Sequence, residues 1–286
     1  MVTIHELIAW GLDDYSYRNS GMSLDKEEFA KALERAEHKL SERACYEPCN
    51  ALMEAETKRI YELLSPHVER DDVRQEYDGL EWSVGVVDLR HVLAFQRRLV
   101  FDPEVTLREA PLQNDWPRLV SLALGSQRST ECTITSRKRD EGYMDVTLES
   151  RNPDLQIRLS PEAGQNGSAP LFLYGGGPFF EVAEFRGRWF LRDGYHRAYG
   201  LLLAGVFLIP AVVIRTRTIE ELGATQPWFF SEEQLLSARP PRVMDFLENH
   251  LVLRYKRPRL INTIRIRIEE SLQPFRKEEE VQGDDL

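Results

Sequence analysis

The chain has 286 residues, 42% of them hydrophobic, and a formal net charge of −10. This hydrophobic content allows a sizeable core and excludes global disorder. The sequence has no run of about 18 apolar residues and no signal-peptide pattern at its N-terminus, so we predict neither a membrane span nor a leader. Its three cysteines, an odd number, are typical of a reducing compartment, and we expect a cytoplasmic protein without a membrane partner.

Most of the negative charge lies at the N-terminal end of the chain. Residues 1–80 contain 18 acidic and 10 basic residues, a net charge of −8. General nucleic-acid binding depends on neutralising phosphate groups, so this balance disfavours a DNA-binding protein or a nuclease. A small pocket for an anion is compatible with it.

Residues 1–79 are predicted to be helical. One helix begins near Leu24, with Ser23 as its N-cap, and a second covers 51–64, with Pro66 just beyond it. Both have apolar residues at helical spacing, as expected of a pair packed against the core or against a partner.

Cys45 and Cys49 form a CxxxC pattern close to His38. Structural zinc usually has four ligands, often in two pairs, and no second pair is evident. We therefore predict no metal site here.

The first core strand is expected at 82–89. A helix at 91–100 should follow and carry Arg97 and Arg98. These two arginines either form a solvated helix face, which is the favoured interpretation, or approach an anion site.

The middle of the chain is less regular. A helix is predicted to begin at Trp116, and the basic triplet 137–139 is interpreted as a solvated turn. Residues 144–148 and 155–159 alternate in polarity and predict a hairpin. The glycine-rich run 174–178 is interpreted as a connector.

Residues 179–214 are the most informative stretch. Alternating apolar residues predict a hairpin that turns at Arg186-Gly187. A helix is expected from Gly194 to about Ala204, with Gly205 at its C-terminal cap. The apolar run 209–214 predicts a strand buried on both faces.

The junction between the second hairpin strand and this helix could bind an anion. Gly194 allows a sharp turn, and the first helical turn has unpaired N–H groups and a partial positive charge. His196 and Arg197 add side-chain donors, and Asp193 could cap the helix. From these residues alone, an anion site and a plain turn with solvated side chains are equal alternatives.

The junction resembles the nucleotide-binding motif of the ParB and sulfiredoxin superfamily. There a Gly-x-His/Arg-Arg turn follows a strand, and a helix and a strand opening with Pro come next. Here the corresponding pieces are GYHR, AYGLLLAG and IPAVVI. The turn is most similar to the DGHHR of the free-serine kinases, with Tyr195 at the first His. Sulfiredoxins have their catalytic Cys at that position, which disfavours a sulfinic acid reductase.

The resemblance implies the core of an α+β fold, and together with the residue patterns on either side it predicts three consecutive segments. These are a helical N-terminal region at 1–80, a ParB/sulfiredoxin-like mixed sheet with helices at 81–220, and a helical or mixed C-terminal region with a disordered tail at 221–286. We expect short helices at 218–222, where the core ends, and at 231–236 and 243–251 in the last segment. Residues 261–272 fit either a strand or a helix.

The same resemblance implies binding of ATP or CTP. The residues at the matching positions are Gly194, Tyr195, His196 and Arg197. A phosphotransferase would also need Mg²⁺ and a carboxylate base acting on a small-molecule substrate that the sequence does not identify. The candidate catalytic residues are Asp193, Glu181, Glu184 and His196.

The alternative is a non-catalytic protein that responds to nucleotide or binds a protein partner or a second copy of itself. The acidic, helical N-terminal region favours a protein partner.

Overall fold

The computed structural model describes residues 1–11, 26–103, 110–125, 132–139, 143–150, 156–159, 171–174 and 179–269. The fold is a mixture of α-helices and β-sheets, as predicted. The chain folds into two compact units, one of residues 1–128 with 177–259 and one of 129–176 with 260–286. This division differs from three consecutive segments, because the N-terminal and most of the C-terminal residues join the central ones in a single unit.

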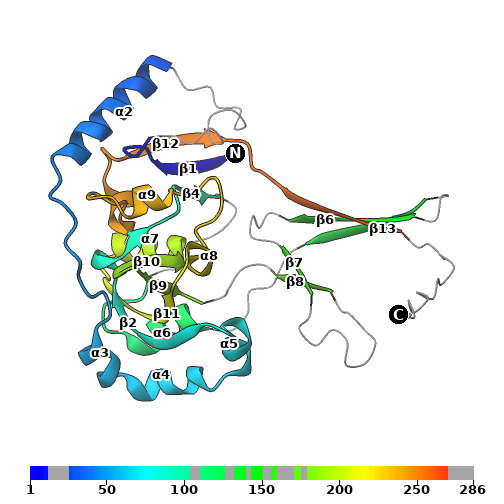
Figure 1. The fold of residues 1–286 in the computed structure, drawn as a ribbon, viewed down its shortest axis with the longest axis horizontal. Helices are drawn as coiled ribbons and strands as arrows, with labels where there is room; N and C mark the ends of the chain where they lie inside the picture. Colours follow the sequence, from blue (N-terminus) through cyan, green and yellow to red (C-terminus); the bar gives the residue numbers. More distant parts are fainter. Residues whose placement is uncertain are drawn as a thin grey trace, which may run out of the picture. The chain divides into compact units, whose positions relative to one another are not determined.

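The first unit contains a five-stranded mixed sheet with the order β2-β11-β9-β10-β3 (Figure 1). Its strands are β2 (Glu81–Asp88), β3 (Leu93–Ala94), β9 (Glu181–Phe185), β10 (Arg188–Asp193) and β11 (Leu208–Thr216). β11 runs parallel to β9 and antiparallel to β2. Residues 209–214 are all buried, as predicted, because this strand has a neighbour on each side and the helix α6 (Trp116–Leu124) packs against it.

β9 and β10 form the predicted hairpin. Arg186 and Gly187 are the turn and have φ angles of 51° and 72°. Two successive positive φ values are typical of the tight turns that match the twist of a hairpin. A shift in register near Asp193 places this residue opposite Glu181.

A second sheet of the first unit has the order β12-β1-β4. Its strands are β1 (Val2–Leu7), β4 (Arg98–Phe101) and β12 (Val252–Arg257). The prediction that residues 1–79 are all helical is therefore wrong at its start. β1 pairs with a strand about 250 residues later in the chain, and no local pattern could show that partner.

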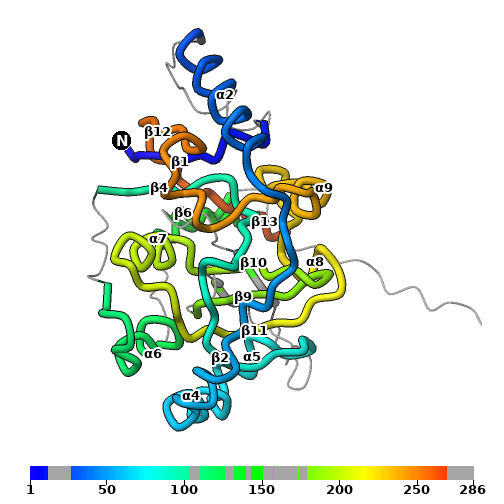
Figure 2. The backbone as a smooth tube through the Cα atoms, turned by 90° about the vertical axis from the view of Figure 1, so that its left-hand side faces the viewer, coloured from blue at the N-terminus to red at the C-terminus, as the bar shows by residue number. Residues whose placement is uncertain are grey.

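Eight α-helices lie within the described ranges. They are α2 (Lys26–Ser41), α3 (Glu54–Arg59), α4 (Tyr61–Val68), α5 (Asp71–Glu76), α6 (Trp116–Leu124), α7 (Tyr195–Leu203), α8 (Ile219–Leu222) and α9 (Glu232–Leu235). There are also two short 3₁₀ helices, η1 (Leu89–His91) between β2 and β3, and η2 (Val243–Leu247) after α9. In both views of the chain, α2 and α4 lie at opposite ends of the first unit (Figures 1 and 2).

Several predicted helices are confirmed. α6 begins after Asp115, whose carboxylate accepts a hydrogen bond from the Arg118 N–H. α7 ends before Gly205, which has a φ of 74°. α8 has Thr218 as its N-cap, and α9 and most of α2 lie where they were expected.

Other predicted helices are wrong. The single helix at 51–64 is two helices that meet at Ile60, and Pro66 lies inside the second. The helix at 91–100 is instead η1 followed by β3 and β4. The helix at 243–251 is shortened to η2.

The second unit contains a sheet of order β13-β6-β5 and a pair β7-β8. Its strands are β5 (Thr133–Lys138), β6 (Tyr143–Ser150), β7 (Gln156–Leu159), β8 (Leu171–Tyr174) and β13 (Asn262–Glu269). The predicted strands exist, but β6 and β7 pair with other strands and do not form one hairpin. The first two residues of the triplet 137–139 belong to β5 and not to a turn.

Some predictions lie outside the described residues. They concern the N-cap at Ser23, the glycine run at 175–178 and the tail after 269. Within the part of the chain that is described, no helix is long and apolar enough to cross a membrane.

Candidate functional site

The candidate site is the junction between β10 and α7. Gly194 is the N-cap residue and has a φ of 101°, a value that side chains disfavour. A Cβ atom at this position would lie 2.5 Å from Cδ2 of Phe180. The prediction that Asp193 caps the helix is wrong, because Gly194 is the N-cap residue; Asp193 Oδ1 accepts from the Gly194 N–H at 2.5 Å. Gly194 is thus required both by its backbone conformation and by an adjacent aromatic ring.

Arg197 is half-buried and contacts protein carbonyl groups. Its Nη1 donates to Leu122 O at 3.1 Å and its Nη2 to Phe179 O at 2.7 Å. The guanidinium also lies 5.6 Å from the ring centre of Phe180. Arg197 therefore joins the end of α6 to the start of β9, which corrects the view of it as a solvated side chain.

Two further groups donate hydrogen bonds to carbonyls at the end of α6. Phe180 N–H donates to Ala123 O at 2.7 Å, and Arg70 donates to Leu124 O. Together with Arg197, these groups satisfy three consecutive carbonyls that a helix end leaves without intrahelical partners.

The two residues between Gly194 and Arg197 differ in exposure. Tyr195 is 4% exposed, and its hydroxyl accepts from the N–H groups of Phe95 and Gln96 at 2.9 and 3.2 Å. Burial raises the pKa of this hydroxyl. His196 is exposed, with Nε2 2.9 Å from Val100 O. Among the side chains expected to bind nucleotide, His196 is thus the one at the surface.

Glu181 is the buried acid nearest the junction along the hairpin. It is 5% exposed and accepts hydrogen bonds from the Tyr77 hydroxyl at 2.7 Å and from Arg192 Nη1 at 3.1 Å. Burial is the main reason why the pKa of Glu181 is raised to about 7. Arg192 acts in the opposite direction, and the charge of Asp193 raises this pKa further.

Sequence reasoning found Glu181 and Asp193 but missed Tyr77. The tyrosine follows α5, more than 100 residues before Glu181 in the chain. Only the apolar periodicity of α4 and α5, which brings them onto the sheet, could have hinted at its position.

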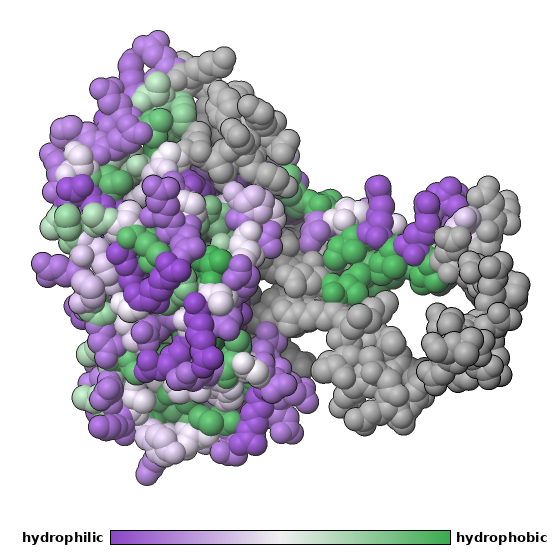
Figure 3. All heavy atoms as spheres, viewed as in Figure 1, coloured by the Kyte–Doolittle hydropathy of each residue, from purple (hydrophilic) through white to green (hydrophobic). Residues whose placement is uncertain are grey.

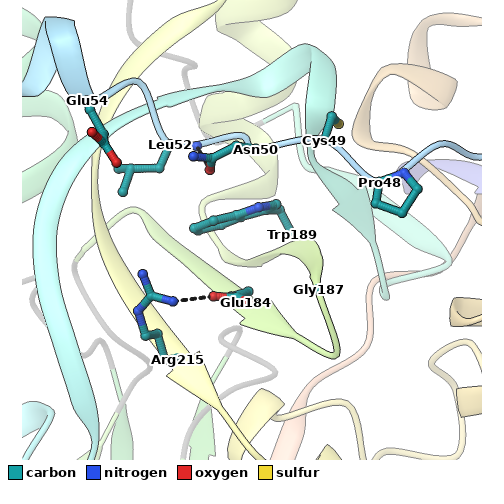
Figure 4. Close-up of a pocket in the computed structure, with 9 residues that line it drawn as sticks. All are labelled: Pro48, Cys49, Asn50, Leu52, Glu54, Glu184, Gly187, Trp189 and Arg215. Atoms are coloured by element: carbon teal, nitrogen blue, oxygen red, sulfur yellow. Dashed lines mark hydrogen bonds and ion pairs between the residues drawn. The ribbon is translucent and has the colours of Figure 1, made fainter.

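Glu184 is not part of this arrangement. It is three residues beyond Glu181 on β9, so their side chains point to opposite faces of the strand. Its Oε2 accepts from Arg215 Nη1 at 2.6 Å. Glu184 and Arg215 line an open cleft of about 360 Å³ together with Cys49 and Trp189 (Figure 4).

Arg97 and Arg98 are neither solvated nor at the junction. Arg97 is 5% exposed and donates to Gly11 O at 2.8 Å and to Gln234 Oε1 at 2.7 Å. Arg98 Nε donates to Glu6 at 2.9 Å. Both alternatives considered for this pair are therefore wrong, because the segment is extended and its side chains enter the core.

The described residues include no group of three or more His, Cys, Asp or Glu side chains that could hold a metal ion. The cysteines Cys45, Cys49 and Cys132 are free thiols.

Comparisons of the chain with protein-family models, with curated proteins and with solved structures found no match. The residues themselves therefore have to support any functional assignment. The junction offers helix N–H groups and an exposed imidazole, with two carboxylates close by in the hairpin.

Proposed function

We propose that this chain binds the phosphate groups of a nucleotide, ATP or CTP, at the first turn of α7 in a ParB/sulfiredoxin-like core. The observation that carries the proposal is the left-handed Gly194 between a strand end and a nine-residue helix. The N–H groups after it start a helix, where an anion is stabilised by the backbone and by the helix dipole. His196 places an exposed imidazole beside them, and its Nε2 would have to leave Val100 O to donate to phosphate.

We further propose that the site transfers a phosphoryl group to a small molecule. Glu181 suits the role of general base, because its pKa of about 7 lies close to neutral pH. The Tyr77 hydroxyl and Arg192 hold its carboxylate in place. Access of a substrate to this buried group would require Arg192, at 25% side-chain exposure, to move aside.

Mg²⁺ is bound through one or two carboxylates together with phosphate oxygens in many phosphotransfer sites. Asp193, which lies opposite Glu181 in the hairpin register, would supply such a carboxylate and leave Glu181 as the base. The ion would supply charge neutralisation at the phosphate. The free cysteines support the proposed cytoplasmic location.

A non-catalytic module is the second candidate, and the contacts of the junction favour it. Arg197 and Tyr195 direct their side chains to backbone groups of the same chain. A turn with these contacts could be retained for folding alone, with the protein acting through a partner.

The test is calorimetric titration of the full chain with ATP and with CTP in the presence of Mg²⁺. Loss of one hydrogen bond to a charged group costs about 1.5–3 kcal/mol, so His196→Ala should bind roughly 10- to 150-fold more weakly. The matched control is His250→Ala, which removes another exposed imidazole far along the chain. If the wild type binds neither nucleotide at about 1 mM, the proposal is wrong and the non-catalytic module takes its place.

A further inference from the structure

The sheet β13-β6-β5 of the second unit has one apolar face. Its register places Ile264 beside Leu148 and Leu148 beside Ile134, and the next two rows are aliphatic in β13 and β6 as well. The residues of this face are Ile134, Met144, Val146, Leu148, Ile264, Ile266 and Ile268. Figure 3 shows apolar side chains gathered along these strands. Ile134 is 56% exposed and Ile268 44%, whereas Leu148 in the central strand is 3% exposed.

The opposite face carries charges that alternate from strand to strand. β13 contributes Arg265 and Arg267, the central β6 contributes Asp145 and Glu149, and β5 contributes Arg137. The order across the sheet is therefore basic, acidic, basic. A strand added outside either basic strand would continue this order if it were acidic.

Opposite charges on this face form ion pairs. Asp145 accepts from Arg267 Nε at 3.2 Å and from Arg139 Nε at 2.7 Å. Arg267 and Arg139 hold the pKa of this carboxyl below its usual range. Arg265 lies opposite Thr147, is exposed, and has no ion pair with any residue that the structure describes.

β13 is also an edge strand. Among the described strands it pairs with β6 alone, and its eight residues are long for an edge. The outer side of such a strand presents N–H and C=O groups that can pair with another chain. Pairing with a second copy centred on Ile266 would place Arg265 opposite Arg267 of that copy, and like charges in that position are destabilising.

We propose that the outer edge of β13 binds an extended segment of another protein in which aliphatic and acidic residues alternate. The segment adds as a strand, so that its main chain pairs with β13. Its aliphatic residues continue the apolar face, and its acidic residues lie beside Arg265 and Arg267.

The probe for this surface is a synthetic peptide based on the eight-residue sequence of β6, YMDVTLES, with Glu in place of its Thr. In the register that β6 has with β13, this peptide YMDVELES places an acidic residue opposite Arg265 and another opposite Arg267. A control peptide has Lys at the Asp and Glu positions. Binding of each labelled peptide to the full chain is measured by fluorescence polarisation. We expect the acidic peptide to bind at least about fivefold more tightly, as one or two favourable cross-strand charge pairs allow.

The variant Arg265→Glu should reverse this preference. It leaves the Arg267–Asp145 pair in place, and circular dichroism will show whether the fold is kept. Arg254→Glu, an exposed arginine on β12 of the first unit, is the matched control and should leave the preference unchanged.

Three results would overturn the proposal. They are no binding of the acidic peptide at about 1 mM, equal binding of both peptides, or an unchanged preference in Arg265→Glu. Sedimentation of the chain without peptide tests whether a second copy of the chain pairs with this edge instead. A dimer that Arg265→Glu strengthens, because the Arg265–Arg267 repulsion becomes an attraction, would assign the edge to a second copy and would also contradict the proposal.

Discussion

Replacing Arg197 by alanine should lower the stability of the first unit more than the affinity for nucleotide. The guanidinium donates two hydrogen bonds to carbonyls, at Leu122 and Phe179. A hydrogen bond to a charged donor contributes about 1.5–3 kcal/mol. Because this side chain is only half-buried, water replaces part of what is lost. We therefore expect about 1–2 kcal/mol for each hydrogen bond and a total loss of about 2–4 kcal/mol in the free energy of unfolding.

A change of 1 kcal/mol shifts the melting temperature of a domain of 150–250 residues by about 2–4 °C. Arg197→Ala should therefore melt about 4–16 °C lower than the wild type. Arg197→Lys should recover little, since an ammonium group cannot span both carbonyls and lie over the Phe180 ring as a planar guanidinium does. Arg217→Ala, at an exposed site just after β11, should change stability by less than about 0.5 kcal/mol.

The sequence alone predicts the opposite result for Arg197→Ala, with nearly unchanged stability and affinity reduced by about 10- to 150-fold. Calorimetric melting and nucleotide titration of the same preparation distinguish the two. If the variant melts within about 1 °C of the wild type and has lost its nucleotide affinity, the role assigned to the two carbonyl contacts is refuted.

Further predictions concern the same hairpin and the whole chain. Gly194→Ala should lose several kcal/mol in denaturant unfolding, because of its φ of 101° and the Phe180 ring 2.5 Å from the new Cβ; Gly200→Ala, in α7 with open space around it, should gain about 0.5–1 kcal/mol. The raised pKa of Glu181, about 7 against 4.5 unfolded, means that the folded state retains a proton that the unfolded state releases. Stability from this group is complete below about pH 4.5 and falls as pH rises to about 7, by up to about 3 kcal/mol. Glu181→Gln should reduce the dependence of the free energy of unfolding on pH between about 4.5 and 7. If that free energy falls equally with pH in the variant and the wild type, Glu181 is not the group responsible. Replacing all three cysteines by serine should leave any nucleotide-dependent activity within a few fold. We expect no tight binding to random duplex DNA, because the net charge of the chain is −10. Ordinary non-specific binding has a dissociation constant of about 10⁻⁴ to 10⁻⁶ M, so submicromolar binding at physiological salt would contradict this expectation.

Local patterns predicted the hairpin, α7 and the buried β11 because each depends on neighbours in sequence. The Arg186-Gly187 turn has the positive φ angles that its residues favour, and β11 is apolar because strands flank it on both sides. The first strand was missed for the opposite reason. β1 is short, and its partners in β4 and β12 are about 95 and 250 residues away.

The sequence predicted which residues lie at the candidate site, but it could not predict which groups their side chains contact. An arginine after Gly194 could reach solvent, a ligand or a carbonyl, and the choice depends on α6, some 75 residues earlier. Glu181 and Glu184 look equivalent in sequence. Strand alternation separates them, and the Tyr77 hydroxyl then makes one of them the buried acid.

The carbonyl contacts of Arg197 restrict how a phosphate could be bound. A guanidinium that donates one N–H of each Nη atom to Leu122 O and Phe179 O has fewer donors left for a phosphate. Two routes remain. In one, Arg197 stays in place and the helix N–H groups with His196 hold the anion. In the other, Arg197 leaves the end of α6 and swings to the phosphate.

The two routes predict different hydrogen-exchange rates for the Phe180 amide, which contacts no ligand in either of them. Phe180 N–H donates to Ala123 O, the carbonyl between those bound by Arg197 and Arg70. If Arg197 stays, saturating ATP with Mg²⁺ should leave hydrogen exchange of this amide unchanged or slower, because local opening becomes rarer. If Arg197 moves, the amide should exchange faster, and Arg197→Ala should show the same fast exchange without nucleotide. Fast exchange on ligand addition would return Arg197 to the binding residues and make release of α6 part of nucleotide binding.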